Sequence, residues 1–400
     1  MCLTCIYLSA NHFNYFWCSS GIIQARGSGL LDIKMSKQFK FMIVGAGFAG
    51  CTLAERVATK LNKKVLLVDR RTHVGGNAYD YYNEDGILVQ KYGPHIFHTD
   101  LKSVWEYLSK FTEWNGYVHR VIAKVRDKEV YLPINIDTME LLYNREFTPK
   151  GLKKYFEKKI VKMDKIKNSH DVVVSQVGEE LYELFFKNYT KKQWGVYPEE
   201  LDPQVTKRLQ VRFNRDTRYF TDRYQGIPKY GFSRLFDNML NNKNIHILLN
   251  TDYREIIELI KYDNIIFTGP IDYFFDYMHG KLPYRSLDFK FETLNIEKFQ
   301  NAAVVNYPND QDYTRLTEFK HFYFQKHNKT TICYEFSKAS GDPYYPIPTP
   351  EYHKIYLKYK KESEKLKNVY FVGRLAEYRY LNMDQVVNRA LRVFKRLKDE

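Results

Sequence analysis

Apolar and polar residues follow a clear pattern from residue 39 onward. Residues 39–44 (FKFMIV) form a mostly apolar run, which predicts a buried strand of a parallel sheet. A glycine-rich turn follows, then a segment with helical periodicity to about Leu61, and a second apolar run at 64–68 that ends at Asp69. Together these segments predict a β-α-β unit of about 30 residues.

The rest of the chain alternates between helical and strand-like segments, and it ends in the same α/β style in which it begins. Helical periodicity is expected at 101–111, 138–200 and 384–397, and strands at 117–133, 281–345 and 368–372, with a turn at Gly373.

This pattern predicts an α/β fold made of a Rossmann-like domain, an inserted helical domain and an antiparallel β-sheet domain. Residues 1–34 lack the pattern and precede a second methionine, Met35, so we expect a disordered N-terminal extension outside the fold. The expected domains are 35–100 with 226–280 and 365–400 for the Rossmann-like domain, 136–205 for the helical domain, and 101–135 with 206–225 and 281–364 for the antiparallel sheet domain.

Charge and cysteine content indicate which partners and which cellular compartment to expect. Lys and Arg outnumber Asp and Glu by 62 to 47, but the basic residues are spread along the chain and no nucleic-acid motif is recognisable. We therefore expect no nucleic-acid partner. No run of 18 apolar residues occurs, which predicts no membrane span. Five cysteines, three of them before residue 19, form no disulfide framework, so a reducing, cytoplasmic compartment is expected.

The turn after the first strand carries a dinucleotide-binding fingerprint, Gly45-x-Gly47-x-x-Gly50. The glycines permit a tight turn, a close approach of pyrophosphate to the backbone and close helix–strand packing, while the helix N-terminus attracts phosphate. Asp69 stands 24 residues after the first glycine, where it can accept hydrogen bonds from ribose. A second glycine pair, Gly75-Gly76, and the late Gly373 turn favour FAD over NAD.

A loop with two histidines, His95 and His98, follows Gly93-Pro94. With no Cys, acid or further His cluster nearby, this loop indicates flavin contact and no metal site. No Ser-His-Asp set or nucleophilic cysteine is recognisable either.

Three blocks resemble UDP-galactopyranose mutases of the bacterial type. They are 93–99 (GPHIFHT), 188–195 (NYTKKQWG) and 373–380 (GRLAEYRY), and they occur in order from about Met35 to the C-terminus. The resemblance implies isomerisation of UDP-galactopyranose to UDP-galactofuranose, in which N5 of reduced FAD acts as the nucleophile at the anomeric carbon without net redox change. It also implies an external reductant such as NADPH, and it leaves a homodimer open.

The resemblance also implies roles for individual residues. Catalytic roles fall on His98, Arg208, Arg315, Glu335, Tyr345 and Tyr380. Substrate contacts fall on Tyr189, Thr190, Trp194, Arg208, Tyr219, Arg285, Asn306, Arg315, Tyr345, Tyr380 and Asn382. Cofactor contacts fall on Gly45, Gly47, Phe48, Gly50, Asp69, Arg70, Gly76, Asn77, His95, Ile96, Gly373, Arg374, Met383, Asp384, Gln385 and Val386. Arg208 and Arg315 are expected to flank the UDP diphosphate, because guanidinium groups bind phosphate with two parallel hydrogen bonds.

Two departures from the resemblance stand out. Many relatives carry Glu at the position of Asp69, and the shorter acid still reaches ribose. Many carry Asp at the position of Asn382, and Asn places one negative charge fewer beside the diphosphate. Two other functions stay open: an amine-oxidase-like FAD oxidoreductase, which shares the fold, and a non-catalytic basic nucleotide or RNA binder, which needs no flavin.

Overall fold

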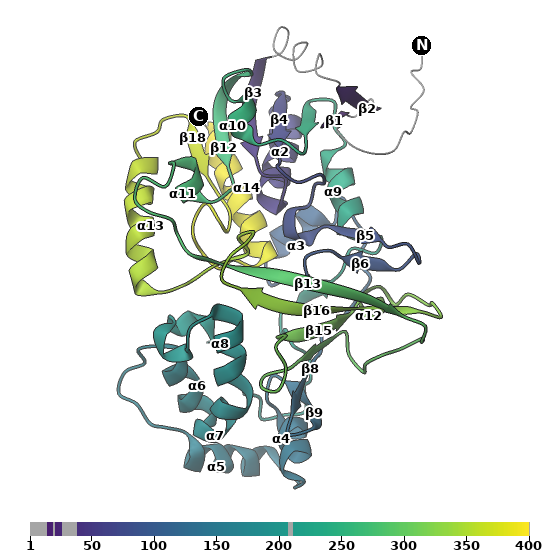
Figure 1. Ribbon diagram of the computed structural model, residues 1–400, viewed down its shortest axis with the longest axis vertical. Coiled ribbons are helices and arrows are strands. Elements are labelled where there is room, and N and C mark those ends of the chain that lie inside the picture. Colours follow the sequence, from purple (N-terminus) through teal and green to yellow (C-terminus); the bar gives the residue numbers. More distant parts are fainter. Residues whose placement is uncertain (1–13, 19–20, 26–37, 207–210, 400) are drawn as a thin grey trace.

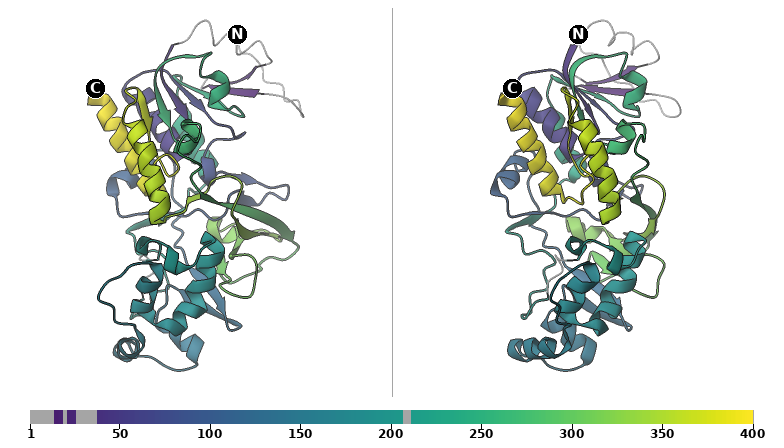
Figure 2. Two further views of the ribbon diagram at one scale, coloured as in Figure 1. Left: turned by 60° about the vertical axis from the view of Figure 1, so that its left-hand side comes forward. Right: turned by 90° about the vertical axis from the view of Figure 1, so that its left-hand side faces the viewer.

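In the computed structural model, residues 14–18, 21–25, 38–206 and 211–399 are described. Three layers follow one another along the long axis: a parallel sheet with its helices, a second and mostly antiparallel sheet, and a helical layer at the opposite end (Figures 1 and 2). The fold is α/β, as the sequence predicts.

The first sheet is parallel over five neighbouring strands. Both faces are covered, and β4 shows why, since Val65 and Leu67 pack into one hydrophobic cluster and Leu66 and Val68 into another. The sheet order is β18 (Val369–Phe371), β12 (Lys261–Phe267), β3 (Gln38–Val44), β4 (Val65–Val68) and β11 (Ile245–Leu248). The helices beside it are α2 (Phe48–Lys60), α9 (Phe232–Leu240), α10 (Tyr253–Ile256), α11 (Ile271–Phe274), α13 (Pro350–Ser363) and α14 (Met383–Asp399).

Two strands extend this sheet beyond β11. The strand β1 (Asn14–Cys18) pairs antiparallel with β11, and β2 (Gly21–Ala25) pairs with β1. This arrangement differs from the expectation that residues 1–34 stand outside the fold, because the free edge of β11 accepts a further strand. The other residues of that stretch lie outside the described residues.

The second sheet is antiparallel except where β14 pairs parallel with β8. The antiparallel pair β8–β9 matches the strands predicted at 117–133. The sheet order is β17 (Tyr345–Pro346), β13 (Tyr284–Leu294), β16 (Thr330–Lys338), β15 (Arg315–Glu318), β14 (Val304–Asn306), β8 (Val121–Val125) and β9 (Lys128–Leu132).

The helical layer follows β9, as the periodicity of 138–200 predicts. The first three of its helices begin at polar caps: the side chains of Asn135, Thr148 and Asn168 each accept a backbone N–H of the first turn. Gly195, with φ of 78°, ends the last helix. The members are α4 (Ile136–Tyr143), α5 (Pro149–Lys159), α6 (Ser169–Val177), α7 (Glu179–Leu181), the π-helix η2 (Tyr182–Lys187) and α8 (Asn188–Trp194).

Short elements connect the layers. The ladder between β7 and β10 is important for the site, because it pairs Gln225 with His98. These elements are η1 (Gly76–Ala78), β5 (Asp80–Tyr82), β6 (Leu88–Gln90), β7 (Phe97–Thr99), α3 (Lys102–Leu108), η3 (Pro198–Glu200), η4 (Pro203–Val205), β10 (Tyr224–Gly226) and α12 (Lys320–Tyr323). Among the described helices, none is long and apolar enough to cross a membrane.

Candidate active site

A cavity of about 490 Å³ lies at the carboxyl ends of the parallel strands, against the turn between β3 and α2. Its shape depends on glycine. Gly45 has φ of 101°, and a Cβ atom at Gly50 would lie 1.9 Å from the carbonyl oxygen of Gly45. A Cβ at Gly76, which has φ of 56°, would lie 3.0 Å from Cα of Gly47. The two glycine-rich turns therefore approach each other with bare backbone, as a bound pyrophosphate requires.

The carboxylate of Asp69 ends β4 beside this turn. It accepts the backbone N–H of Ala46 at 2.7 Å and of Arg71 at 2.8 Å, which fixes the turn from within. Burial raises the pKa of Asp69, against these two bonds and the charges of Arg71 and Arg70. Each carboxylate oxygen accepts up to two hydrogen bonds, so capacity for a ribose hydroxyl remains. These features fit FAD.

A second turn, after β18, closes the same cavity. Gly373 has φ of 108°, and Arg374 follows it. The guanidinium of Arg374 donates to the carbonyl of Leu381 at 3.1 and 2.6 Å and lies over the rings of Tyr345 and Tyr380. Arg374 is therefore held in place before any ligand binds.

A second cavity, of about 220 Å³, lies between the antiparallel sheet and the helical layer. It shares three lining residues with the first cavity: His95, Arg374 and Met383. A group bound across this wall would face both cavities.

Arg315 lines the second cavity and is held there by an ion pair. Its Nε and one Nη each lie 3.0 Å from the same oxygen of Glu335, a carboxylate that is only 2% exposed. Burial opposes the charge of Arg315, but Glu335 together with Tyr189, Tyr345 and Tyr219 holds the pKa of Arg315 above its ordinary value. The guanidinium keeps donors to spare, so it can also bind an anion in the cavity.

Three aromatic side chains lie together on the wall of the second cavity. The ring centroids of Trp194, Tyr345 and Tyr380 lie 5.6 to 6.0 Å apart. Burial, and then the nearby Glu335, raises the pKa of Tyr345, so its hydroxyl stays protonated and able to donate. The group can supply both ring contacts and hydroxyl donors to a ligand.

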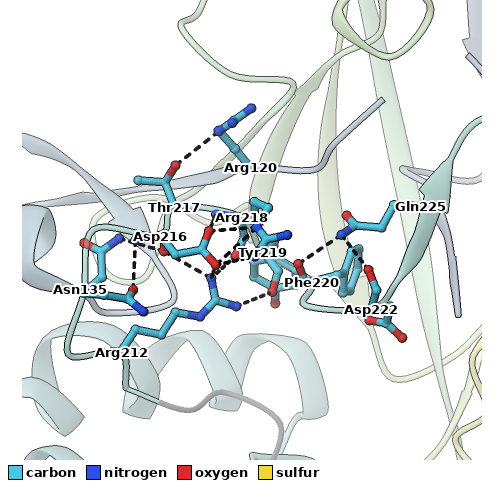
Figure 3. A network of polar contacts seen from close by, with 11 residues as sticks. Arg120, Asn135, Arg212, Asp216, Thr217, Arg218, Tyr219, Phe220, Asp222 and Gln225 are labelled. Carbon is cyan, nitrogen blue, oxygen red and sulfur yellow. Dashed lines mark hydrogen bonds and ion pairs between the residues drawn. The ribbon is translucent and has the colours of Figure 1, made fainter. Parts of the chain in front are cut away.

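A polar network shapes the loop at residues 211–220 (Figure 3). Arg212 donates to the backbone carbonyls of Asp216, Arg218 and Tyr219, and the loop turns back on itself as a result. Tyr219 and Phe220 thereby reach the cavity wall. Arg208, the predicted partner of Arg315, lies outside the described residues.

Most predicted residues line one of the two cavities. The first cavity takes Gly45, Gly47, Phe48, Asp69, Arg70, Gly76, Asn77, His95, Gly373, Arg374, Met383 and Val386. The second takes Ile96, His98, Tyr189, Thr190, Trp194, Tyr219, Asn306, Arg315, Tyr345, Tyr380 and Asn382. Gly50, Arg285, Glu335, Asp384 and Gln385 line neither cavity.

Two of these act from behind the wall. Glu335 holds Arg315, as described above. Arg285 donates from Nε to the carbonyl of Gln193 at 3.0 Å and from an Nη to that of Lys192 at 3.1 Å. Its positive charge therefore sits at the C-terminus of α8, where it complements the helix dipole and fixes the helix that carries Trp194.

Sequence reasoning missed several lining residues, among them Gln193, His119, Phe185 and Phe186. Gln193 is 7% exposed, and its side-chain oxygen has no hydrogen-bond partner among the described residues. Such a buried acceptor suits a ligand N–H or O–H. Helical spacing could have found it, because Gln193 follows Tyr189 by one turn of α8.

Comparison with known proteins relates the chain to a family. The family model for UDP-galactopyranose mutase matches residues 184–380, and that for an NAD(P)-binding Rossmann-like domain matches residues 43–111. A probable UDP-galactopyranose mutase of Klebsiella pneumoniae is 40% identical over 88% of this chain and 92% of its own. A dTDP-fucopyranose mutase of Escherichia coli is 38% identical over 88% of this chain and 96% of its own.

The fold also matches a solved structure. A reduced UDP-galactopyranose mutase superposes with a TM-score of 0.72 at 16% identity, over 91% of this chain and 94% of that one. On the strength of the identity to its relatives over most of its length, the chain belongs to the UDP-galactopyranose mutase family.

Proposed function

We propose that this chain binds FAD in the first cavity and isomerises UDP-galactopyranose to UDP-galactofuranose in the second. The observation that carries the proposal is the wall of His95, Arg374 and Met383 that the two cavities share. A flavin ring at this wall meets a sugar held from the other side. When bound and reduced, FAD supplies the N5 nucleophile at the anomeric carbon; the protein supplies orientation and charge.

The residues of the second cavity then divide the work on the nucleotide sugar. Arg315, fixed by Glu335, binds the diphosphate and stabilises the charge that grows on the leaving oxygen. Tyr345 and Tyr380 donate hydroxyl hydrogen bonds to the phosphates. Trp194 and the buried oxygen of Gln193 face the nucleoside. Arg208 is proposed to close the diphosphate site from the other side.

The setting of the reaction belongs to the same proposal. An external reductant, NADPH or a similar donor, prepares the flavin, and the reaction takes place in the cytoplasm. Cys51 and Cys333 are buried and unpaired, which suits a reducing compartment. A homodimer is compatible with the proposal and is not required by it.

A second substrate deserves the same test, because the chain is nearly as similar to a dTDP-fucopyranose mutase as to a UDP-galactopyranose mutase. The two substrates differ in the base methyl group, the ribose 2′-hydroxyl and the sugar 6-hydroxyl. The chemistry at the anomeric carbon and the diphosphate site is common to both.

The test begins with the purified protein, which should be yellow and should release FAD on heating. Dithionite-reduced protein is then incubated with UDP-galactofuranose, and with dTDP-fucopyranose in parallel, and the products are separated by chromatography. We expect UDP-galactopyranose from the reduced protein and almost none from the oxidised protein, with no net use of reductant. Oxygen consumption that matches turnover would favour the oxidase alternative. A colourless protein that cannot take up FAD would favour the nucleotide binder.

A further inference from the structure

A third cavity takes no part in the reaction proposed above. It has a volume of about 710 Å³ and lies among three segments, 116–120, 297–303 and 318–326. Four cationic side chains and two carboxylates line it: Arg120, Lys298, Lys320 and Lys326, with Glu297 and Glu318. Positive charge therefore predominates, which favours an anionic ligand.

The carboxylate of Glu318 is already satisfied by its own surroundings. Glu318 is 1% exposed and accepts the backbone N–H groups of Phe299 and Gln300 at 3.0 and 2.8 Å and the hydroxyl of Thr330 at 2.6 Å. Nε2 of His321 lies 3.1 Å from the same carboxylate. These partners occupy both oxygens, so Glu318 is not the counter-ion of the lysines that line the cavity.

Lys320 is the buried cation of the third cavity. It is 7% exposed, and its Nζ donates to the carbonyl oxygen of His327. Within the described ranges, no carboxylate lies at ion-pair distance from Lys320, Lys298 or Lys326. Burying an ammonium group without a counter-charge is costly, and the group has three donors, of which the carbonyl takes one. Lys320 can therefore bind an anion in the cavity, together with the exposed Lys298 and Lys326.

Phe324 and Tyr117 give the cavity an aromatic surface. Their ring centroids lie 6.1 Å apart, and Phe324 is 62% exposed. Phe324 has φ of 50°, in the left-handed region, where phenylalanine is uncommon. Aromatic side chains bind flat heterocycles by stacking, and cations beside them bind phosphate. The combination fits a nucleotide.

One extended segment separates the third cavity from the second. Val118 and Arg120 line the third cavity, whereas His119 and Val121 line the second. This alternation is expected of an extended chain, whose successive side chains point in opposite directions. The hydroxyl of Tyr117, which lines the third cavity, also lies 3.1 Å from Nδ1 of His119. A ligand on one side of this wall is therefore close to the residues on the other side.

Arg120 connects the wall to the loop at residues 211–220. Its Nε donates to the hydroxyl of Thr217 at 3.2 Å (Figure 3). The same loop brings Tyr219 and Phe220 to the second cavity. A phosphate in the third cavity would compete for Arg120, because a charge-assisted hydrogen bond is stronger than one to a neutral hydroxyl. Loss of the bond to Thr217 would loosen the loop that supplies Tyr219.

We propose that the third cavity is an effector site for a nucleotide. Its phosphate binds Lys298, Lys320 and Lys326 and draws Arg120 away from Thr217. The site itself depends only on the third cavity, whereas its effect on the second cavity rests on the proposed function. A bound nucleotide weakens substrate binding, and by thermodynamic linkage bound substrate weakens nucleotide binding by the same factor.

Titration calorimetry of the oxidised holoenzyme, in which FAD fills the first cavity, measures the site with AMP and with inorganic phosphate as probes. AMP should bind about 10-fold more tightly than phosphate, because the two anions carry similar charge and the adenine adds stacking. Phe324→Ala should remove this advantage. Lys298→Ala combined with Lys326→Ala should weaken AMP binding about 10-fold.

The matched control combines Lys281→Ala with Lys290→Ala, which removes the same charge from exposed positions outside the cavity. Lys320→Met should abolish AMP binding, and if this variant fails to fold, the double variant at the exposed positions decides the question. Undetectable AMP binding in the wild type, or equal losses in the two double variants, would overturn the site.

The coupling between the cavities has its own measurement. Saturating AMP should raise the Kd of UDP about 5-fold, and saturating UDP should raise the Kd of AMP by the same ratio. Thr217→Val removes the acceptor of Arg120, and Thr217 does not line the third cavity. This variant should bind AMP, bind UDP as weakly as the AMP-saturated wild type, and show no coupling.

An unchanged Kd of UDP in the presence of AMP, or coupling that survives in the Thr217→Val variant, would overturn the effector role. A wild type that binds AMP through the lysines but does not bind UDP would instead contradict the proposed function.

Discussion

At the scale of single residues, side chains of the same type have different chemical properties because their surroundings differ. His95, His98 and His119 line one cavity. Burial keeps His95 and His119 neutral near pH 7, whereas His98 lies beside the carboxylate of Asp222. Arg315 and Arg285 differ in a similar way. Glu335 holds the first towards the cavity, whereas backbone carbonyls at the end of α8 take the donors of the second.

Acid should destabilise the protein through its buried neutral histidines. The pKa values of His95 and His119 are about 4 and about 3 in the fold, against 6.5 when unfolded. Between pH 6.5 and 4 the unfolded chain binds protons that the fold excludes, so this stability is present above pH 6.5 and is lost as the pH falls. Each histidine accounts for on the order of 3 kcal/mol.

Urea unfolding at pH 7.5 and pH 5 measures this loss. His119→Gln should reduce the difference between the two pH values by about a third, because burial also lowers the pKa of His73 to about 4. His353→Gln, at an exposed position of α13, is the control and should leave the difference unchanged. A wild-type pH dependence in the His119→Gln variant would contradict the prediction.

The arginines of the diphosphate site should act on turnover and leave the flavin in place. A charge-assisted hydrogen bond contributes about 1.5–3 kcal/mol, so Arg315→Ala and Arg208→Ala should each lower kcat/KM about 10- to 100-fold. Lysine at either position should recover only part of the loss, because a point charge lacks the paired donors. Arg374→Ala is the contrasting variant and should lower flavin occupancy.

Flavin absorbance per protein and steady-state kinetics with UDP-galactofuranose test all three positions. Wild-type turnover in Arg315→Ala would mean that the diphosphate lies elsewhere, even with FAD correctly placed.

At the scale of helices and strands, local signals predicted the elements and the glycine turns well. The β-α-β unit, the hairpin at 117–133 and the helices after it depend on periodicity and turn residues, which are local. The contacts between elements were not predictable in this way. Asp222 reaches His98, and Arg285 reaches α8, only because segments far apart in the sequence become neighbours. The local pattern of residues 14–25 did not predict that β1 pairs with the edge strand β11.

Lys192 joins two of the elements that form the second cavity. It lies on α8, and its Nζ donates to the carbonyls of Tyr307, Gln311 and Tyr313, in the loop between β14 and β15. That loop connects Asn306 to Arg315. Lys192→Met keeps the length of the side chain but leaves the carbonyls without their donor. We expect KM to rise about 10-fold and stability to fall by about 1–3 kcal/mol.

The matched control is Lys191→Met, since Nζ of Lys191 is exposed and donates to the hydroxyl of Tyr197.

The dependence of stability on pH gives a second test of Lys192. Burial lowers the pKa of Lys192 to about 8, despite the charges of Asp310 and Asp312. Between pH 8 and 10.5 the unfolded chain holds the extra proton, so wild-type stability relative to Lys192→Met should rise with pH. A difference that stays flat across this window would contradict the assignment.

At the scale of the whole molecule, the site exists only where the layers meet. The parallel sheet supplies the first cavity, the helical layer and the antiparallel sheet supply the second, and His95, Arg374 and Met383 lie at the junction. We therefore expect mutations away from the junction to affect either substrate binding or flavin binding alone. Mutations at the junction should affect both. The positive net charge of +15 adds a general attraction for an anionic nucleotide sugar.

We expect the N-terminal segment, residues 1–34, to be dispensable for FAD binding and for turnover. The strands β1 and β2 lie at the edge of the first sheet, and the described residues of this segment, 14–18 and 21–25, line neither cavity. Removing them leaves five parallel strands with β11 as the new edge, and the glycine turns and Asp69 lie on the strands further inside.

A chain that starts at Met35 should therefore bind FAD stoichiometrically and turn over like the full chain. Its thermal unfolding should shift by only a few degrees, because edge strands add little to the buried core. Flavin content, kcat and Tm of the two chains, purified side by side, check this. Loss of flavin from the shorter chain would show that β1 supports the dinucleotide turn through β11, and the edge of the sheet would then belong to the site.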